Sequence, residues 1–407
     1  MKTGWVLLVT ILGVTCACSD GSDGGRYSVR DSAGIRVIEN RVPAWRAGGA
    51  WRIDPNPSLD LGGPRSPPEL HFQQLSDFGE LRNGNFAAAD ITTREVYFFS
   101  AAGEILAVNG GEGQGPGEFD ALWGLAVLGE RVFAYEPHSA RLTVYDSAGG
   151  FLEATTLEQP EDTPPLYTYS LVGTTEGQLV LSPRMFTPSP SGSVSIYRDS
   201  APNLLFRPDG RFQGDVAEPS GVDMFVSVQG ASSVPFTVVS LIAATGDRIL
   251  MSHGKDFEVR AFRGTGPPFQ IFRRSYSRRP VTEDDLQQAF ANHLQMAGAS
   301  SARDPRFEGF RRMMESAPLP EEMPSIGRLL VDDLGYAWCQ HFRPTDEAIG
   351  TVWSIFSAQG DWLGELQMPV GFRPGLIGSD YLLGVYTDSL DVHHVWRLPL
   401  NRGRGAG

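Results

Sequence analysis

The chain has 407 residues, of which 41% are hydrophobic, 20% charged and 10% aromatic. Acidic residues outnumber basic ones by 48 to 34, and the net charge of −14 argues against nucleic acid as a partner, because a phosphate-binding surface is positively charged. The 47 glycines and 29 prolines indicate many turns, and therefore short strands rather than long helices.

The N-terminus carries an export signal. Lys2 precedes an apolar run over 4–14, which suits a signal peptide and is shorter than the ~20 residues that a membrane span needs. Ala17 before Cys18 resembles the cleavage site of a bacterial lipoprotein, in which the cysteine is lipidated. The sequence therefore predicts a lipoprotein signal peptide over 1–17, lipidation of Cys18 and a flexible linker over 18–25. An ordinary cleaved signal peptide is the alternative.

Cysteine usage agrees with this prediction. Removal of 1–17 leaves Cys18 and Cys339, and acylation of Cys18 leaves Cys339 with no cysteine to pair with. Because Cys339 lies in an apolar, strand-like run, we expect a buried structural thiol rather than a nucleophile.

Six hairpin patterns recur along the chain. Each has an apolar pair, a few polar residues with a Gly or Asp turn, and a second apolar run, as two strands joined by a tight turn have. The copies are spaced by 50, 46, 70, 88 and 47 residues. They are LSDFGELRNGNFAAA (75–89), LAVLGERVFAY (125–135), LVGTTEGQLVL (171–181), LIAATGDRILM (241–251), LLVDDLGYAWC (329–339) and LIGSDYLLGVY (376–386).

A second pattern of two strands around a Gly turn follows most of these hairpins. Together the two patterns make a meander of about 45 residues, the size of one propeller blade. The predicted fold class is all-β: a six-bladed β-propeller of four-stranded antiparallel blades over 26–400, with a short two-helix insertion between blades 4 and 5. Expected core positions are Phe98, Val144, Tyr145, Trp338, Trp353 and Trp396.

The glycine-rich stretch GGEGQGPGEF (110–119) needs its own explanation. No lysine lies near it and its glycines lack the dinucleotide-binding spacing, so a phosphate-binding loop is excluded. Its position between two meanders predicts a connector that reverses direction over the rim of the propeller.

Several stretches resemble a known family. The GPGEF connector is similar to the linker of NHL-type and related six-bladed propellers. VRDSAGIRVIEN (29–40), RRPVTEDDL (278–286) and LLGVYTDSLDVHHVWRLPL (382–400) resemble exported bacterial six-bladed propeller lipoproteins (NHL/TolB-like) of undetermined activity. The resemblance covers most of 26–400 and implies the propeller fold, with export and a lipid anchor.

The two chain ends are expected to meet. Either 35–40 or 51–61 should pair with the last strands and close the ring, because closure removes exposed sheet edges. Residues 401–407 are predicted to be a disordered tail.

The long gap before the fifth hairpin predicts a helical insertion over 275–320. Thr282 and Asp285 resemble a capping box, and Leu286, Phe290 and Leu294 form one apolar stripe of a helix. A second helix is expected from 304–305, with its own stripe at Phe307, Phe310 and Met314.

A basic cluster stands immediately before this insertion. Its guanidinium groups suit capture of a carboxylate, sulfate or phosphate, although pairing with the acidic residues over 283–285 is the competing interpretation. The candidate anion-binding residues are Arg273, Arg274, Arg278 and Arg279.

No linear catalytic motif is present. His393 and His394 are the only adjacent histidines, and neighbours on a strand point to opposite faces, so we expect no metal there. No cofactor and no catalytic residue are predicted.

The predicted function is that of an exported, monomeric scaffold in the periplasm or at the outer membrane. A lipid anchor would attach it to the membrane, and it would bind a protein, peptide or glycan but no nucleic acid. The alternative is a propeller enzyme, a hydrolase or lyase with a metal-assisted site in the central funnel.

Overall fold

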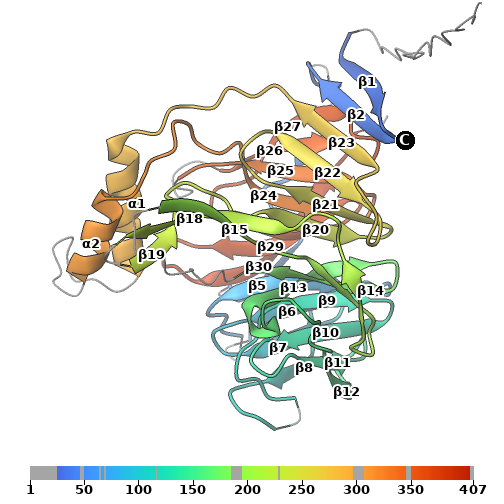
Figure 1. Ribbon diagram of the computed structural model, residues 1–407. Helices are drawn as coiled ribbons and strands as arrows, with labels where there is room; N and C mark the ends of the chain where they lie inside the picture. The colour runs from blue at the N-terminus through green and yellow to red at the C-terminus, as the bar shows by residue number, and fades with distance from the viewer. Residues whose placement is uncertain are drawn as a thin grey trace, which may run out of the picture.

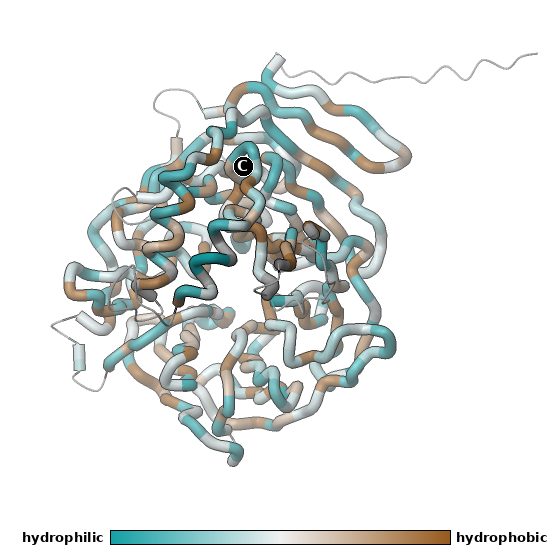
Figure 2. The backbone as a smooth tube through the Cα atoms, turned by 60° about the vertical axis from the view of Figure 1, so that its left-hand side comes forward, coloured by the Kyte–Doolittle hydropathy of each residue, from teal (hydrophilic) through white to brown (hydrophobic). Residues whose placement is uncertain are grey.

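The computed structural model describes residues 25–45, 50–63, 66–67, 70–115, 117–184, 195–227, 230–296, 307–344 and 350–403. Its sheets stand side by side around a common axis, and hydrophobic segments recur along their strands (Figure 1 and Figure 2). This arrangement confirms the prediction of an all-β propeller.

Four sheets of the ring have four or five strands each. The first contains β5 (Leu75–Glu80), β6 (Phe86–Asp90), β7 (Glu95–Phe99) and β8 (Ile105–Gly110). The second contains β9 (Leu125–Leu128), β10 (Arg131–Glu136), β11 (Arg141–Tyr145) and β12 (Phe151–Thr156). Another contains β24 (Ile326–Val331), β25 (Ala337–His341), β26 (Val352–Phe356) and β27 (Trp362–Gln367). The last contains β28 (Phe372–Ile377), β29 (Tyr381–Thr387) and β30 (His393–Asn401), with β3 (Arg52–Ile53) and β4 (Leu59–Leu61).

The fifth sheet of the ring has ten strands. One part is β13 (Tyr169–Thr175), β14 (Gln178–Pro183), β16 (Leu204–Phe206) and β17 (Phe212–Asp215). The other part is β20 (Leu241–Thr245), β21 (Arg248–Ser252), β22 (Glu258–Phe262) and β23 (Gln270–Arg274), extended by β1 (Tyr27–Ser32) and β2 (Ile35–Asn40). Two parallel contacts hold it together: β13 pairs with β20, and β2 pairs with β23.

The expected six four-stranded antiparallel blades are therefore wrong. Counted as hydrogen-bonded sheets, the described part of the ring has five blades, because the segments expected to form the third and fourth blades share one sheet. Gly173 of β13 pairs with Ala244 of β20 at this junction. A Cβ atom at Gly173 would lie 3.0 Å from the carbonyl oxygen of Ala244, so the missing side chain lets the two strands approach closely enough to pair. Repeats along the sequence do not reveal such sideways pairing.

The six predicted hairpins themselves are confirmed as antiparallel strand pairs: β5–β6, β9–β10, β13–β14, β20–β21, β24–β25 and β28–β29. The first strand of each hairpin contacts the first strand of the next, and β28 returns to β5. These first strands surround a central channel.

The chain ends close the ring. β4 pairs with residues 395–397 of β30, and β3 pairs with residues 400–401 of the same strand. This confirms that one N-terminal segment joins the last strands, and it selects 51–61. The segment 35–40 instead forms β2 of the ten-stranded sheet, between the edge strand β1 and β23. At the C-terminal end, β30 extends through Asn401, beyond the predicted domain limit of 400.

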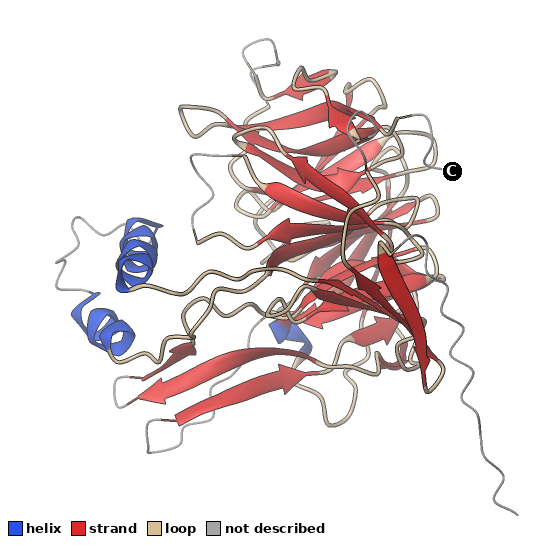
Figure 3. Cartoon of the chain, turned by 90° about the horizontal axis from the view of Figure 1, so that it is seen from above, coloured by secondary structure: helices blue, strands red, loops and turns tan. Residues whose placement is uncertain are grey.

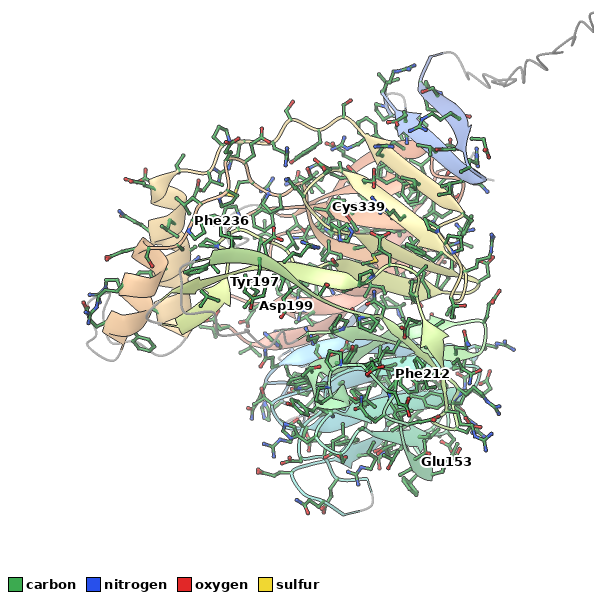
Figure 4. The ribbon with its side chains drawn as sticks, in the orientation of Figure 1. Glu153, Tyr197, Asp199, Phe212, Phe236 and Cys339 are labelled. Atoms are coloured by element: carbon green, nitrogen blue, oxygen red, sulfur yellow. The ribbon has the colours of Figure 1, made fainter. Side chains whose placement is uncertain are left out.

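The core lies between neighbouring sheets and contains most of the predicted residues. Phe98, Val144, Tyr145, Trp338 and Trp353 are fully buried. Trp396 is half-buried and stacks on Tyr386. Cys339, labelled in Figure 4, lies in β25 and is also fully buried. These contacts supply the apolar burial that stabilises the described part of the ring.

The glycine-rich stretch over 110–119 is a connector between β8 and β9, as predicted. Gly110 and Gly111 have φ values of 111° and 95°, in the left-handed region that glycine tolerates best. The carboxylate of Glu118 accepts a hydrogen bond from the backbone N–H of Gly115 at 2.8 Å, which fixes the turn. Pro116 lies outside the described residues.

Two groups of elements project from one side of the ring (Figure 3). The first is a three-stranded sheet of β15 (Ser195–Ala201), β18 (Ser220–Ser227) and β19 (Gly230–Ser233). The second is α1 (Glu283–Met296) with α2 (Glu308–Glu315). Because β18 and β19 precede β20 and the helices precede β24, both groups leave the ring on the face where the channel-lining strands begin. We call it the projecting face.

The prediction that only a short two-helix insertion projects from the ring is therefore also wrong. A sheet that the sequence analysis did not predict accompanies the helical segment, and α1 is the one described helix longer than eight residues. The capping box is confirmed: the hydroxyl of Thr282 donates to the Asp285 carboxylate at 2.8 Å and accepts from its N–H at 3.3 Å. Among the described residues no helix is long and apolar enough to cross a membrane.

Candidate functional site

A side pocket of about 320 Å³ lies where the two projecting groups meet the ring. Arg198 and Asp223 reach it from β15 and β18, and Arg278 and Glu322 reach it from the segments on either side of the helices. Lys255, which follows β21, completes its charged lining. The pocket therefore exists only because both projecting groups are present.

The pocket presents both signs of charge. Arg198 and Asp223 form an ion pair at 2.9 Å, and Arg278 and Glu322 form another at 2.5 Å. Lys255 is exposed and is the only lysine besides Lys2. A ligand that carries both acidic and basic groups fits such a lining better than a purely anionic one.

Phe236 gives the pocket a strained aromatic wall. Its φ of 56° lies in the left-handed region, where a bulky side chain costs about 1–3 kcal/mol. The residue is half-buried, and Figure 4 labels it beside the projecting elements. Strain of this kind persists only when neighbouring structure holds the residue in place.

A hydrogen-bonded row connects the three-stranded sheet to the ring beneath the pocket. The Glu218 carboxylate accepts from Nε2 of His253 at 2.5 Å, and from Arg260 at 2.8 and 2.9 Å. Burial alone would raise the pKa of Glu218, but the hydrogen bonds from His253 and Arg260 outweigh it and lower the pKa. Since Nε2 then carries the proton, Nδ1 accepts the Ser240 hydroxyl at 2.8 Å.

The order serine, histidine and carboxylate is also found in serine hydrolases. Here Ser240 is only 5% exposed, and its Oγ already accepts the backbone N–H of Gly221 at 2.9 Å. Arg198 also lies 3.2 Å from Nδ1 of His253 and 3.3 Å from the Ser240 Oγ. We interpret the row as a clamp that fixes the projecting sheet on the ring.

A second cavity, of about 530 Å³, lies in the central channel. Asp77 of β5, Ser170 of β13 and Arg328 of β24 line it, together with Arg184, which follows β14. Asp77, Ser170 and Arg328 are each the second or third residue of their strands. Because β13 and β14 are antiparallel, the last residue of β14 lies beside the first residue of β13. All four therefore lie at the channel mouth on the projecting face.

Arginines tie the channel-lining strands together at this mouth. Arg328 donates to the carbonyl of Pro374 at 2.7 Å, and Arg373 of β28 donates to the carbonyl of Leu75 at 2.8 Å. Asp77 accepts from the Ser76 hydroxyl at 2.8 Å. Burial raises the pKa of Asp77, while Ser76 and the charges of the surrounding arginines oppose the shift. The mouth thus combines three arginines with one carboxyl group.

The sequence analysis did not single out these channel residues, because they are spread over nearly three hundred positions. A signal was present: Asp77, Arg328 and Arg373 are charged residues near the start of the first strands of their hairpins. A charge at this place in a blade points into the channel mouth. Aligning the six hairpins by their first strands could have found all three.

The four arginines predicted to bind an anion lie in two places, and each pairs with carboxylates of the chain. Arg273 and Arg274 are the last residues of β23, whereas Arg278 and Arg279 precede α1. Their partners are Glu39 and Glu258 for Arg273, Glu365 for Arg274, Glu322 and Asp256 for Arg278, and Asp285 for Arg279. These contacts are of the competing, charge-pairing kind, and anion binding by the cluster stays a prediction. Cys18 lies outside the described residues.

The adjacent histidines do not share one site. His394 is buried and contacts Asp60 at 2.8 Å through Nδ1, and its Nε2 lies 3.6 Å from Asp388. His393 points elsewhere, and its pKa is lowered by burial first and then by Arg373. Across the described ranges, no three His, Cys, Asp or Glu side chains are grouped as metal ligands.

The fold and site define an all-β propeller with a charged channel mouth and a side pocket on one face. No family model matches the chain. No curated protein sequence matches it either. Among solved structures it is similar to a DUF4221 family member from Bacteroides vulgatus, with a TM-score of 0.50 and 10% identity over 87% of this chain and 98% of that one. At this identity the likeness shows the fold alone.

Two further solved structures are similar at lower scores. A Bacteroides fragilis protein that carries the name exported protein has a TM-score of 0.49 and 13% identity, over 90% of this chain and 99% of that one. A streptogramin B lyase has a TM-score of 0.41 and 10% identity, over 86% of this chain and 98% of that one. The sheets of the ring and the structure with a TM-score of 0.50 support the propeller shape implied by the family resemblance. The NHL relation and the lipid anchor stay predictions.

Proposed function

We propose that the protein is an extracytoplasmic, lipid-anchored β-propeller that binds a protein, peptide or glycan on its projecting face. The side pocket of about 320 Å³ carries this proposal, because two separate groups of elements that project from the ring converge to form it. Insertions on a rigid scaffold are common carriers of binding function. The ring supplies that scaffold.

The lining of the pocket supports a ligand with mixed chemistry. Arg198, Arg278, Lys255, Asp223, Glu321 and Glu322 all line a volume that holds a few amino-acid or sugar residues. The half-buried ring of Phe236 offers a surface for an aromatic or aliphatic side chain or for a sugar face. Charges of both signs would then set the orientation of the ligand.

The export signal and Cys18 support the location. A lipid at Cys18 followed by a polar linker would hold the ring near the membrane surface and leave the projecting face accessible. The Cys18→Ser variant should leave the membrane fraction or accumulate unprocessed. Unchanged processing and fractionation of this variant would remove the lipid anchor from the proposal.

The binding function can be tested on peptide and glycan arrays and with envelope extracts, using the full-length protein. We expect the double variant Lys255→Glu and Arg278→Glu to lose binding of the ligands that the wild-type protein retains. Arg131→Glu is the matched control, because Arg131 is exposed on β10 and pairs with the equally exposed Glu153 far from the pocket. Equal binding by the pocket variant and the control would refute the side pocket as the ligand site.

A further inference from the structure

The channel mouth is a second site, separate from the side pocket. Its cavity of about 530 Å³ is lined by four strands of the ring, β5, β13, β20 and β24, and by the end of β14. Ser170, Arg184 and Arg328 line it together with Asp77, and Arg373 stands close enough to act on the charge of Asp77. In a chain with a net charge of −14, this is a local excess of positive charge.

The hydroxyl of Ser170 points to a missing partner. Ser170 is 2% exposed and lines the cavity, yet its Oγ has no hydrogen-bond partner among the described residues. A buried polar group without a partner costs about 1–3 kcal/mol. The other two serines that line the cavity are satisfied, because Ser182 donates to Asn203 and Ser240 contacts His253. Ser170 is therefore the hydroxyl that a bound group would complete.

The charge balance selects the chemistry of that group. Arg184, Arg328 and Arg373 bring three positive charges against one carboxylate, which leaves two positive charges when Asp77 is ionised. Guanidinium groups hold carboxylates and phosphates through paired N–H donors. The guanidinium of Arg184 has no ion pair or side-chain hydrogen bond with a described residue, so it can turn toward a ligand without breaking a contact shown here.

We propose that the channel mouth binds a small dianion, a dicarboxylate or a phosphate group, held by Arg184 and Arg328 with the Ser170 hydroxyl as a further donor. Arg373 adds its charge from the neighbouring strand, and it ties β28 to β5 through the carbonyl of Leu75. Asp77 weakens the site by repulsion when it is ionised. This site does not depend on a ligand in the side pocket.

Isothermal titration of the full-length protein with succinate and with inorganic phosphate, at constant ionic strength, tests the proposal. Constant ionic strength removes non-specific screening from the comparison. Binding of succinate alone assigns a carboxylate ligand and binding of phosphate alone assigns a phosphate ligand, and either result supports the site. Binding of neither anion overturns it.

Four variants make the test specific. Arg184→Gln and Arg328→Gln should each weaken the affinity by about tenfold or more, as loss of a charge-assisted hydrogen bond does. Ser170→Ala should weaken it by a smaller factor, about two- to tenfold. Asp77→Asn should strengthen it, a result that mere damage to the fold would not produce.

Arg207→Gln serves as the matched control, because Arg207 is exposed on the β16–β17 turn and pairs with Asp209. The affinity of Arg207→Gln for the anion should equal that of the wild-type protein. If Arg328→Gln fails to fold, Arg184→Gln decides, since this variant breaks no contact shown for the Arg184 side chain. Unchanged affinity in Arg184→Gln, or weaker binding in Asp77→Asn, would overturn the dianion site.

Discussion

Arg274 joins two neighbouring sheets, and its replacement by alanine should cost a large part of the protein's stability. Its side chain is 4% exposed at the end of β23, and Nη1 lies 2.9 Å from the Glu365 carboxylate of β27. The guanidinium carbon lies 4.1 Å from the ring centre of Trp362 and 4.5 Å from that of Phe257. The Arg274→Ala variant removes all of these contacts at once.

The magnitude follows from three contributions. The charge-assisted hydrogen bond contributes about 1 kcal/mol, the low end of its range, because Glu365 is 44% exposed and water can replace the arginine. Contacts with the two aromatic rings contribute about 1–2 kcal/mol in a desolvated site. The space left between the sheets adds about 1 kcal/mol. We therefore expect a loss of about 3–4 kcal/mol in the free energy of unfolding.

His341 is an uncharged neighbour of the Arg274 guanidinium near neutral pH. Burial first, and then the charge of Arg274, lowers the pKa of His341 to about 4, so its Nε2 accepts a hydrogen bond from Nη2 of Arg274 at 3.2 Å near neutral pH. Arg274→Lys keeps the charge but not the planar group, and should recover about half of the loss.

Urea unfolding followed by tryptophan fluorescence at pH 7 measures these differences. Arg273→Ala is the matched control: it removes the neighbouring residue, whose side chain is 35% exposed and pairs with Glu39 and Glu258. We expect the control to lose less than about 1 kcal/mol. Equal midpoints for Arg274→Ala and Arg273→Ala would refute the view that this buried arginine holds the two sheets together.

Three further predictions follow from other parts of the ring. Asp332→Ala should lower stability by about 3 kcal/mol or more in the same assay, because buried Asp332 accepts from the N–H groups of Leu334 and Tyr336 and from the Trp338 indole; a loss below 1 kcal/mol would contradict this. Burial first, and then Glu80 and Asp332, raises the pKa of Asp333 to about 6, above its usual 3.8. The folded state therefore binds this proton more tightly than the unfolded state, and the stability that Asp333 contributes is present below about pH 4 and lost as pH rises through 6. Asp333→Asn should accordingly raise the urea midpoint at pH 7 with a gain that shrinks toward pH 4, and a gain independent of pH would refute the assignment. Finally, replacing 275–320 by a short Gly/Ser linker should leave a β-rich circular dichroism spectrum and a somewhat lower Tm, because β23 ends at Arg274 and β24 begins at Ile326; complete unfolding would show that the ring depends on this segment.

Local patterns in the sequence were sufficient to predict the hairpins. Alternating apolar residues around Gly and Asp turns depend only on neighbours in the chain, and all six pairs were found where they were expected. The join between β13 and β20 was missed because it depends on two backbones meeting sideways at Gly173. The blade count was wrong for the same reason.

The three-stranded sheet and the sites were harder to predict for a different reason. β15 has the sequence SIYRDSA, in which the charged residues Arg198 and Asp199 and then Ser200 follow one another. Such a strand lacks the apolar run that marked the others. The side pocket and the channel mouth draw single residues from strands far apart in sequence. No local spacing brings Arg184 near Arg328, whereas the ring does so by placing the ends of their strands at one face.

The pairing of β4 with β30 has a consequence for the order of folding events in an exported chain, the location that we propose for this protein. Leu61 pairs with Val395, about 330 residues further along the chain, so the ring is sealed by contacts between an N-terminal strand and the last strand. A chain emerging from the translocation machinery cannot make these contacts until nearly all of it has crossed. Until then the edges of the first and last sheets stay open, and such edges are where aggregation begins. The protein therefore most needs a chaperone between the emergence of its first strands and the pairing of β4 with β30. Substitutions that weaken β30 should reduce the yield of folded protein before they reduce the stability of the finished ring.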